Sequence, residues 1–195
     1  RYMIAGELGR GGMGQVLQVD DLFLKRTVAV KVLTLPGREA RRRFVDEARL
    51  TARLDHPGVV PVHDVGETPD GKPFFAMKRI RGRSLHQVIH TGGMPQLSER
   101  LDVFKRVCEA VAFANDAGVL HLDLKPDNVM VGAYGEVLVV DWGLATEVGD
   151  GGASMRQVAG TPAYMAPEQA TAGASLDRRT DVYALCAVLY ELLSG

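Results

Sequence analysis

The stretch His121–Asn128, which reads HLDLKPDN, decides the fold more than any other part of this 195-residue chain. It follows an amphipathic segment in which we expect Ser98 to cap a helix. It precedes a short β-type run at Val129–Val131. The apolar stripe expected on the helix consists of Leu101, Phe104, Cys108, Val111 and Asn115. HLDLKPDN is therefore predicted to be a loop that core elements hold at both ends.

The polar residues of this loop suit the transfer of a phosphoryl group. Asp123 can orient a hydroxyl and accept its proton, and Lys125 can neutralise the transferred group. Asn128 offers an amide oxygen to Mg²⁺, which prefers oxygen ligands. Asp141 follows the predicted strand Val137–Val140 and would be a second oxygen ligand. Each residue alone is common in turns or on surfaces, but their order between these elements favours a catalytic site.

A glycine-rich stretch near the N-terminus fits the pattern G-x-G-x-x-G-x-V. Its four defined positions are Gly9, Gly11, Gly14 and Val16. The pattern lies between the predicted strands Met3–Leu8 and Gln15–Val19, so we expect a β-hairpin turn rather than the start of a helix. Glycines let backbone N–H groups approach phosphate oxygens. An ordinary glycine turn is the alternative for this stretch taken alone.

A lysine and a glutamate follow this loop at positions where they could pair. The predicted strand Thr27–Leu33 places Lys31 on the same face as the small Ala29, which leaves room for a flat ring. The next segment, from Arg38 to Leu54, has helical spacing and carries Glu47. Glu47 could hold the Lys31 ammonium toward phosphates, although a helical glutamate is more often a solvated charge.

The chain changes character after about residue 80. Residues 1–80 read as strands with one helix, and Val59–Val65 and Pro73–Ile80 flank a turn signal, as in a hairpin. Residues 81–195 read mainly as helix and end in the apolar helix Asp181–Leu193. The long segment between Asp141 and Glu168 has little periodicity, which is typical of a functional loop. These patterns predict an α+β fold with two domains, 1–80 and 81–195.

The composition is that of a folded protein with balanced charge. Lysine and arginine number 23 against 24 aspartate and glutamate, which gives a net charge of −1 and argues against a nucleic-acid partner. The two cysteines lie far apart, so we expect no disulfide framework. No run reaches the length of a membrane helix and no signal peptide opens the chain, so the expected location is cytoplasmic. A membrane anchor outside this sequence stays compatible with that expectation.

Taken together, these motifs resemble the eukaryotic-like serine/threonine protein kinases of bacteria. The resemblance runs from Arg1 to Gly195 and includes two further motifs, A-P-E at Ala166–Glu168 and the aspartate Asp181, which in the family supports the catalytic loop. It implies a bilobal protein-kinase-like fold, with a strand-rich N-lobe at 1–80 and a partial, mainly helical C-lobe at 81–195. Later helices of the family would lie beyond Gly195.

The resemblance also implies ATP and Mg²⁺ as cofactors and assigns roles to individual residues. Adenine would lie between Val16 and Ala29 on one side and Met130 on the other, with Met77 as gatekeeper. The catalytic residues implied are Lys31, Glu47, Asp123 and Lys125, and the metal ligands are Asn128 and Asp141. The nucleotide-binding residues implied are Gly9, Gly11, Gly14, Val16, Ala29, Lys31, Met77, Lys78, Ile80 and Met130.

The expected acceptor is a serine or threonine hydroxyl of a protein substrate. Lys125, two residues after Asp123, is the pattern of serine/threonine kinases, and Thr161 resembles the threonine that touches both. Kinases of small molecules lack the segment that ends in A-P-E. Two alternatives remain open, a pseudokinase or nucleotide-binding scaffold, and a structural interaction module. The sequence does not indicate an oligomeric state.

Several positions depart from the family pattern. Leu122 stands where an arginine commonly binds a phosphate of the activation loop, so we expect activity without phosphorylation read through this position, even if Thr146 or Ser154 is phosphorylated. Trp142 replaces a phenylalanine and is expected to pack beside His121, with a partner for its indole N–H. Glu168 resembles a glutamate whose arginine partner lies beyond Gly195. We therefore expect these 195 residues alone to be poorly soluble or inactive.

Overall fold

The structure is a computed structural model that describes residues 1–11, 14–94, 96–148, 153–154 and 158–195. The chain divides into two compact units. The first contains Arg1–Asp55 and Val60–Ile80, and the second contains His56–Val59 and Arg81–Gly195. The chain thus passes from one unit to the other after Ile80, while four residues of the predicted first domain belong to the second unit.

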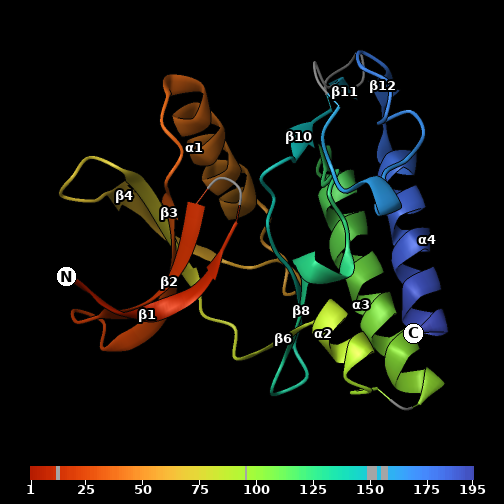
Figure 1. Cartoon of the computed structure of the whole chain (residues 1–195), viewed down its shortest axis with the longest axis horizontal. Helices are drawn as coiled ribbons and strands as arrows, with labels where there is room; N and C mark the ends of the chain where they lie inside the picture. The colour runs from red at the N-terminus through yellow and green to blue at the C-terminus, as the bar shows by residue number, and fades with distance from the viewer. Residues whose placement is uncertain (12–13, 95, 149–152, 155–157) are drawn as a thin grey trace. The chain divides into compact units, whose positions relative to one another are not determined.

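The first unit is an antiparallel sheet with one helix (Figure 1). Its five strands have the order β1-β2-β3-β5-β4, and the helix α1 spans Arg38–Arg53. The strand bounds are β1 Tyr2–Arg10, β2 Gly14–Asp21, β3 Arg26–Leu33, β4 Val62–Glu67 and β5 Pro73–Lys78. β1 and β2 form the hairpin that the glycine-rich pattern predicts.

Successive side chains of β3 point to opposite faces of the sheet, and apolar residues cover both faces. Its three valines, Val28, Val30 and Val32, pack with residues of β2 and β5 in one apolar cluster. Leu33 packs on the other side with Phe75 and with Phe44 and Ala48 of α1. The predicted helix is confirmed, and Lys31 lies on the face that α1 covers.

The second unit is mainly helical. Its long helices are α3, Leu97–Asp116, and α4, Arg178–Ser194, which lie side by side (Figure 1). A short helix α2 spans Leu85–His90, and two single turns are η1, Pro126–Asn128, and η2, Pro162–Tyr164. Its strands are β6 Gly82–Ser84, β7 Val119–Leu120, β8 Val129–Gly132, β9 Val137–Val139, β10 Thr146–Glu147, β11 Ala153–Ser154 and β12 Ser175–Leu176.

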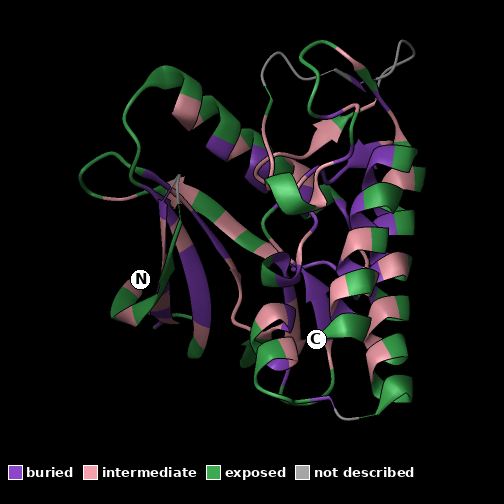
Figure 2. Cartoon of the chain, turned by 45° about the vertical axis from the view of Figure 1, so that its right-hand side comes forward, coloured by how far each residue is buried: buried purple, intermediate pink, exposed green. Residues whose placement is uncertain are grey.

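The sheets of the second unit are small. β6, β8 and β9 form a three-stranded sheet, and β7 pairs with β10 while β11 pairs with β12. The predicted strands on either side of the Gly132–Gly135 turn are confirmed as β8 and β9. In this unit β7 and β9 are buried throughout, whereas the long helices have exposed residues on their outer turns (Figure 2). Among the described residues, no helix is both long and apolar enough to cross a membrane.

The start and buried face of α3 differ from the prediction. The helix begins at Leu97, and the residue before it, Gln96, makes no side-chain capping bond, so the predicted cap at Ser98 is wrong. The buried residues are Val107, Ala110, Val111 and Ala114. Large apolar side chains dominated the predicted stripe, whereas small alanines form much of the real one because α3 packs closely on β9 and α4.

The sequence prediction also missed α2 and the true start of α4. Ser84 and Gln87 form a capping box that begins α2, in which each side chain bonds the backbone N–H of the other. Asp177 caps α4 by accepting a hydrogen bond from the backbone N–H of Arg179. The last helix therefore starts three residues before the predicted Asp181.

Candidate functional site

In the first unit, the predicted pair of Lys31 and Glu47 is present. Lys31 Nζ lies 2.6 Å from Glu47 Oε1, and the two side chains are 12% and 3% exposed. β3 places the lysine, because this strand pairs on both sides with β2 and β5. The glutamate comes from the buried face of α1. An ion pair with this little solvent holds the ammonium in one position more firmly than a surface pair would.

The glycine-rich turn combines a packed glycine with two open ones. A Cβ added to Gly14 would lie 2.2 Å from the carbonyl oxygen of Val32, so a side chain cannot fit beside β3. A Cβ on Gly9 or Gly11 would meet no atom within 4 Å. The Gly11 N–H donates to the Gly14 carbonyl at 2.8 Å and closes the turn. Residues 12 and 13 of the pattern lie outside the described residues.

The residues expected around adenine are distributed over both units. Ala29 is buried and lies opposite the half-buried Met77 in the β3–β5 pairing. Val16 of β2 lies opposite Lys31 of β3. The backbone N–H of Lys78 donates to the Pro61 carbonyl at 3.1 Å. Ile80, also half-buried, is the last residue of the first unit. In the second unit, half-buried Met130 of β8 lies between Ser84 of β6 and Leu138 of β9.

In the second unit, Asp123, Lys125 and Thr161 form a closed triangle of hydrogen bonds. Lys125 Nζ donates to Asp123 Oδ2 at 2.9 Å and to Thr161 Oγ1 at 2.7 Å. The Thr161 hydroxyl donates to Asp123 Oδ1 at 2.8 Å. The contact of the threonine with both charged residues, which the resemblance implied, is confirmed. The triangle shows that a hydroxyl can sit between this carboxylate and this ammonium.

The donor set beside this triangle suits a magnesium ion. Asn128 is buried, and its Nδ2 donates to the Asp123 carbonyl at 2.8 Å and to Asp123 Oδ2 at 3.2 Å. Because Nδ2 of Asn128 faces Asp123, the side-chain oxygen of Asn128 lies on the other side of its amide group, away from Asp123. Asp141 is exposed and has a positive φ of 61° at the end of the chain segment that follows β9. An amide oxygen and a carboxylate are the ligands that Mg²⁺ takes in proteins, so these residues fit the ion.

Asp181 of α4 holds the backbone of the loop His121–Asn128. Its carboxylate is fully buried and accepts from the N–H groups of His121 at 2.9 Å and Leu122 at 3.0 Å. It also accepts from Asn115 Nδ2 at 2.8 Å. Leu122 has a φ of 64°, a left-handed conformation that is strained for a leucine. The bonds to Asp181 therefore stabilise a turn that the local sequence would not adopt alone.

His121 is a buried, neutral part of the same loop. Burial lowers the pKa of its imidazole, although the nearby Asp181 acts in the opposite direction. Its Nε2 lies 3.3 Å from the Val140 carbonyl, and its Nδ1 accepts from the Asp123 N–H at 3.3 Å. These partners suit the neutral tautomer that carries its proton on Nε2. The ring thus joins the loop to the segment that leads to Asp141.

Trp142 packs where the sequence predicted. Its ring centroid lies 4.6 Å from that of His121, and the side chain is fully buried. The indole N–H donates to the Val139 carbonyl at 3.4 Å, so the expected polar partner is present.

Leu122 faces apolar neighbours. Its side chain is 3% exposed and packs in a cluster with Leu120, Ala153 and Leu176. Ala153 belongs to β11, inside the segment between Asp141 and Glu168. This segment is therefore attached to the catalytic loop by hydrophobic contact at the position where an arginine would bind a phosphate.

The sequence prediction missed Gln169 and the partner that Glu168 has within this chain. Gln169, which is buried, donates from Nε2 to the Leu122 carbonyl at 2.5 Å and to the Ala159 carbonyl at 2.8 Å. Glu168 is half-buried and accepts from the Thr180 hydroxyl at 2.8 Å. The polar Gln169 directly after the A-P-E motif was the available signal, but the partners of both side chains become visible only in the fold.

Comparison with known proteins agrees with this geometry. The family model described as "Protein kinase domain" matches residues 2–195. The chain is 42% identical over 204 aligned positions to the serine/threonine-protein kinase PknB of Mycobacterium tuberculosis and 40% identical to that of Mycolicibacterium smegmatis. It is 39% identical to a probable serine/threonine-protein kinase PknB of Corynebacterium glutamicum.

The alignments cover 100% of this chain but 32%, 32% and 31% of these three relatives. The chain thus spans about a third of the length of the curated relatives it matches. The match of a family model over almost every residue and the identities near 40% lead to one conclusion: this chain belongs to the protein kinase domain family.

Proposed function

We propose that the protein is a serine/threonine protein kinase that transfers the γ-phosphoryl group of ATP to serine or threonine hydroxyls of protein substrates. The observation that carries the proposal is the triangle of Asp123, Lys125 and Thr161, in which a hydroxyl donates to the carboxylate and accepts from the ammonium. A substrate hydroxyl needs the same two partners during phosphoryl transfer. The similar proteins are named as serine/threonine-protein kinases, which supports the same class of reaction.

In this proposal, the first unit binds and orients the nucleotide. The open space beside Gly9 and Gly11 lets the backbone of the turn approach phosphate oxygens closely. Lys31, held by Glu47, places its ammonium against the phosphates. Ala29, Val16 and Met77 offer apolar surface to the adenine ring, and the backbone from Lys78 to Ile80 offers hydrogen bonds to its edge.

The second unit acts on the transferred group and the acceptor. Asp123 Oδ1 orients the acceptor hydroxyl and accepts its proton. Lys125 Nζ balances the negative charge that the transferred group spreads over its oxygens. The amide oxygen of Asn128 and the carboxylate of Asp141 would hold Mg²⁺, which supplies positive charge to the phosphates.

The geometry favours an enzyme over a pseudokinase. A pseudokinase or nucleotide-binding scaffold does not need a carboxylate poised on a hydroxyl. Here Asp123 is within hydrogen-bond distance of a hydroxyl, an ammonium and an amide. A structural interaction module would need none of the five charged or amide side chains, which are Lys31, Glu47, Asp123, Asn128 and Asp141.

The test is transfer of labelled γ-phosphate from ATP to serine- and threonine-containing peptides by the full-length protein. Asp123→Asn keeps the size of the side chain and removes the base, so we expect the turnover number to fall by about 10²- to 10⁴-fold. Asp127→Asn is the matched control, because Asp127 lies in the same loop, is exposed and has no role in this proposal. Equal turnover of the wild type and Asp123→Asn would overturn the proposal that the protein is an enzyme.

A thermal-shift measurement separates the alternatives. The proposal expects magnesium-dependent stabilisation by ATP in both the wild type and Asp123→Asn, because the nucleotide is bound by other residues. ATP binding without turnover in the wild type would favour the scaffold. The absence of any magnesium-dependent ATP binding would favour the structural module.

A further inference from the structure

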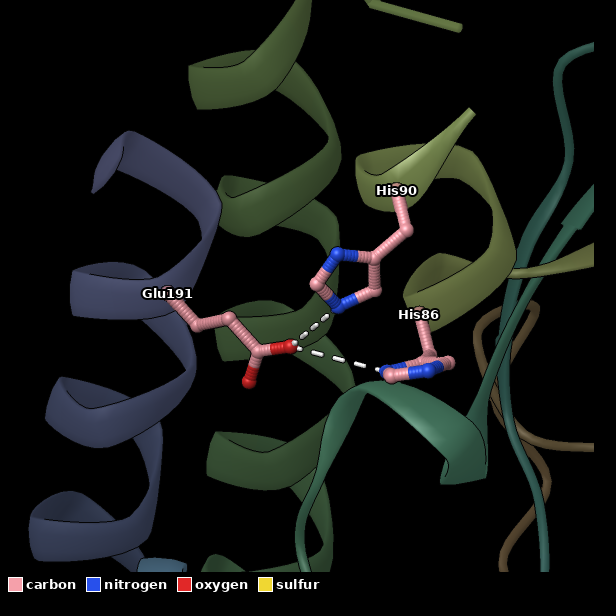
Figure 3. Close-up of side chains that lie close together, drawn as sticks. All are labelled: His86, His90 and Glu191. Carbon is pink, nitrogen blue, oxygen red and sulfur yellow. Dashed lines mark ion pairs between the residues drawn. The ribbon is translucent and has the colours of Figure 1, made fainter. Parts of the chain in front are cut away.

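A second cluster of side chains in the second unit has the composition of a transition-metal site. His86 and His90 lie one turn apart on α2, and both imidazoles point toward Glu191 of α4 (Figure 3). Among the described residues, they form the one group of three or more His, Cys, Asp or Glu whose ligand atoms all lie within 4.8 Å of one another. None of the three belongs to the phosphoryl-transfer site.

The two distances from the histidines to Glu191 match those between ligands of a tetrahedral zinc ion. Two ligands that each lie about 2.0–2.2 Å from such an ion are about 3.3–3.6 Å apart. His86 Nδ1 lies 3.6 Å from Glu191 Oε1, and His90 Nε2 lies 3.4 Å from the same oxygen. Good hydrogen bonds between nitrogen and oxygen are shorter, at about 2.7–3.2 Å. The spacing therefore suits a shared ion better than two direct bonds.

The backbone around the cluster holds the ligands in place. The capping box of Ser84 and Gln87 starts α2, so the two histidines share one face of a formed helix turn. The hydroxyl of Tyr164, in η2, donates to Oε2 of Glu191 on α4, which leaves Oε1 directed at the histidines (Figure 3). The three side chains are 45%, 47% and 21% exposed, so an ion can reach them from solvent.

We propose that His86 Nδ1, His90 Nε2 and Glu191 Oε1 bind a zinc ion, with water as the fourth ligand. Two imidazoles and one carboxylate are a common ligand set for Zn²⁺. Mg²⁺ does not compete well, because it prefers oxygen ligands. The ion would join α2 to α4 and, through Tyr164, to the η2 turn that follows Thr161. It would thus stabilise the segment that carries the threonine of the catalytic triangle.

The experiment measures zinc binding to the full-length protein, purified without a histidine tag, by competition with a chromophoric chelator. Excess Mg²⁺ is present throughout to occupy oxygen-ligand sites. The variants are His90→Gln and Glu191→Gln, and Glu191→Gln keeps an acceptor for Tyr164. The matched control is His63→Gln, because His63 is an exposed histidine on β4 of the other unit.

We expect the wild type and His63→Gln to bind one zinc ion with equal affinity, and both cluster variants to bind at least about tenfold more weakly. Asp141→Asn should bind zinc as the wild type does, which separates this site from the magnesium ligands and from the outcome of the phosphate-transfer test. Cobalt should give the visible absorption of a four-coordinate ion in the wild type, and His90→Gln should lose it.

Zinc should also raise the thermal midpoint of the wild type and leave that of folded His90→Gln unchanged. Circular dichroism checks that the variants are folded. If His90→Gln is not folded, Glu191→Gln replaces it in this measurement. Equal zinc affinity in all variants, a loss confined to Asp141→Asn, or no zinc bound by the wild type in excess Mg²⁺ would overturn the site.

Discussion

The two units hold a buried carboxylate in different ways. In the first, Glu47 faces the ammonium of Lys31 across a gap of 2.6 Å. In the second, Asp181 accepts three described hydrogen bonds, and all three donors are uncharged N–H groups of His121, Leu122 and Asn115. An ion pair joins two side chains, whereas a carboxylate that binds backbone N–H groups determines the path of the chain itself.

This difference reflects what each unit must position. Lys31 and Glu47 lie on a sheet and a helix whose apolar clusters are already packed, so their pair adjusts one ammonium. Asp181 supports a loop that includes Leu122 in a left-handed conformation. Loss of the ion pair should therefore affect chemistry more than folding, and loss of Asp181 should affect both.

The largest effect is expected for Asp181→Ala. Two buried backbone N–H groups and one amide lose their acceptor, at about 1–3 kcal/mol each, so the free energy of unfolding should fall by at least about 3 kcal/mol. Urea unfolding of the wild type and the variant measures this difference. Asp116→Ala, at the exposed end of α3, is the control and should stay within about 0.5 kcal/mol. A change below about 1 kcal/mol for Asp181→Ala would contradict the role in holding the loop.

Glu47→Gln should sharpen the contrast. The amide keeps the size of the side chain but loses the charge, so the free energy of unfolding should fall by about 2 kcal/mol. A displaced Lys31 should also lower kcat/KM for phosphate transfer by about 10²-fold. Glu39→Gln on the same helix is the control, because Glu39 makes only exposed ion pairs, with Arg42 and Arg43. The comparison fails if both variants lose the same activity.

The first unit should show a specific response to acid. The hydrogen bond from Arg1 lowers the pKa of Asp21 from 3.8 to about 2, with help from the backbone N–H groups of Leu24 and Phe23. A lowered folded-state pKa contributes stability that is present above pH 3.8 and is lost as the pH falls toward about 2. Urea midpoints of Asp21→Asn should therefore change less over this range than those of the wild type. Parallel pH profiles would exclude the contribution.

The smallest effect is expected from the loop that Leu122 contacts. Because this loop is attached by the apolar cluster of Leu122, Ala153 and Leu176, it needs no phosphate for attachment at this position. The double variant Thr146→Ala and Ser154→Ala should keep phosphate transfer within about twofold of the wild type. Loss of turnover in this variant would show that phosphorylation is required in spite of the leucine.

Local sequence patterns predicted much of the molecule. The glycine hairpin, the strand with Lys31, the helix with Glu47 and the strands on either side of the Gly132–Gly135 turn follow from alternation, helical spacing and turn residues, which act over a few positions. The ion pair of Lys31 and Glu47 was predicted as a possible pairing that gained weight from the other motifs, and it is confirmed.

The missing parts depend on contacts between distant residues. The buried face of α3 was predicted one register away, since only packing against β9 and α4 reveals that alanines form it. The bonds from Gln169 to Leu122 and from Thr180 to Glu168 join elements that sequence order does not bring together. The cluster of His86, His90 and Glu191 is spread over 106 positions of the sequence, and no spacing rule unites it.

The sequence by itself therefore determined which residues we propose for the chemistry, since HLDLKPDN, the glycine pattern and Lys31 are short motifs with local meaning. Tertiary structure decided how those residues are held. Asp181 lies on α4, 58 positions after Asp123 in the sequence. Only the packing of α4 within the second unit brings its carboxylate to the backbone of His121 and Leu122. A buried charge can be satisfied by any nearby donor, and which donors are near is a property of the fold.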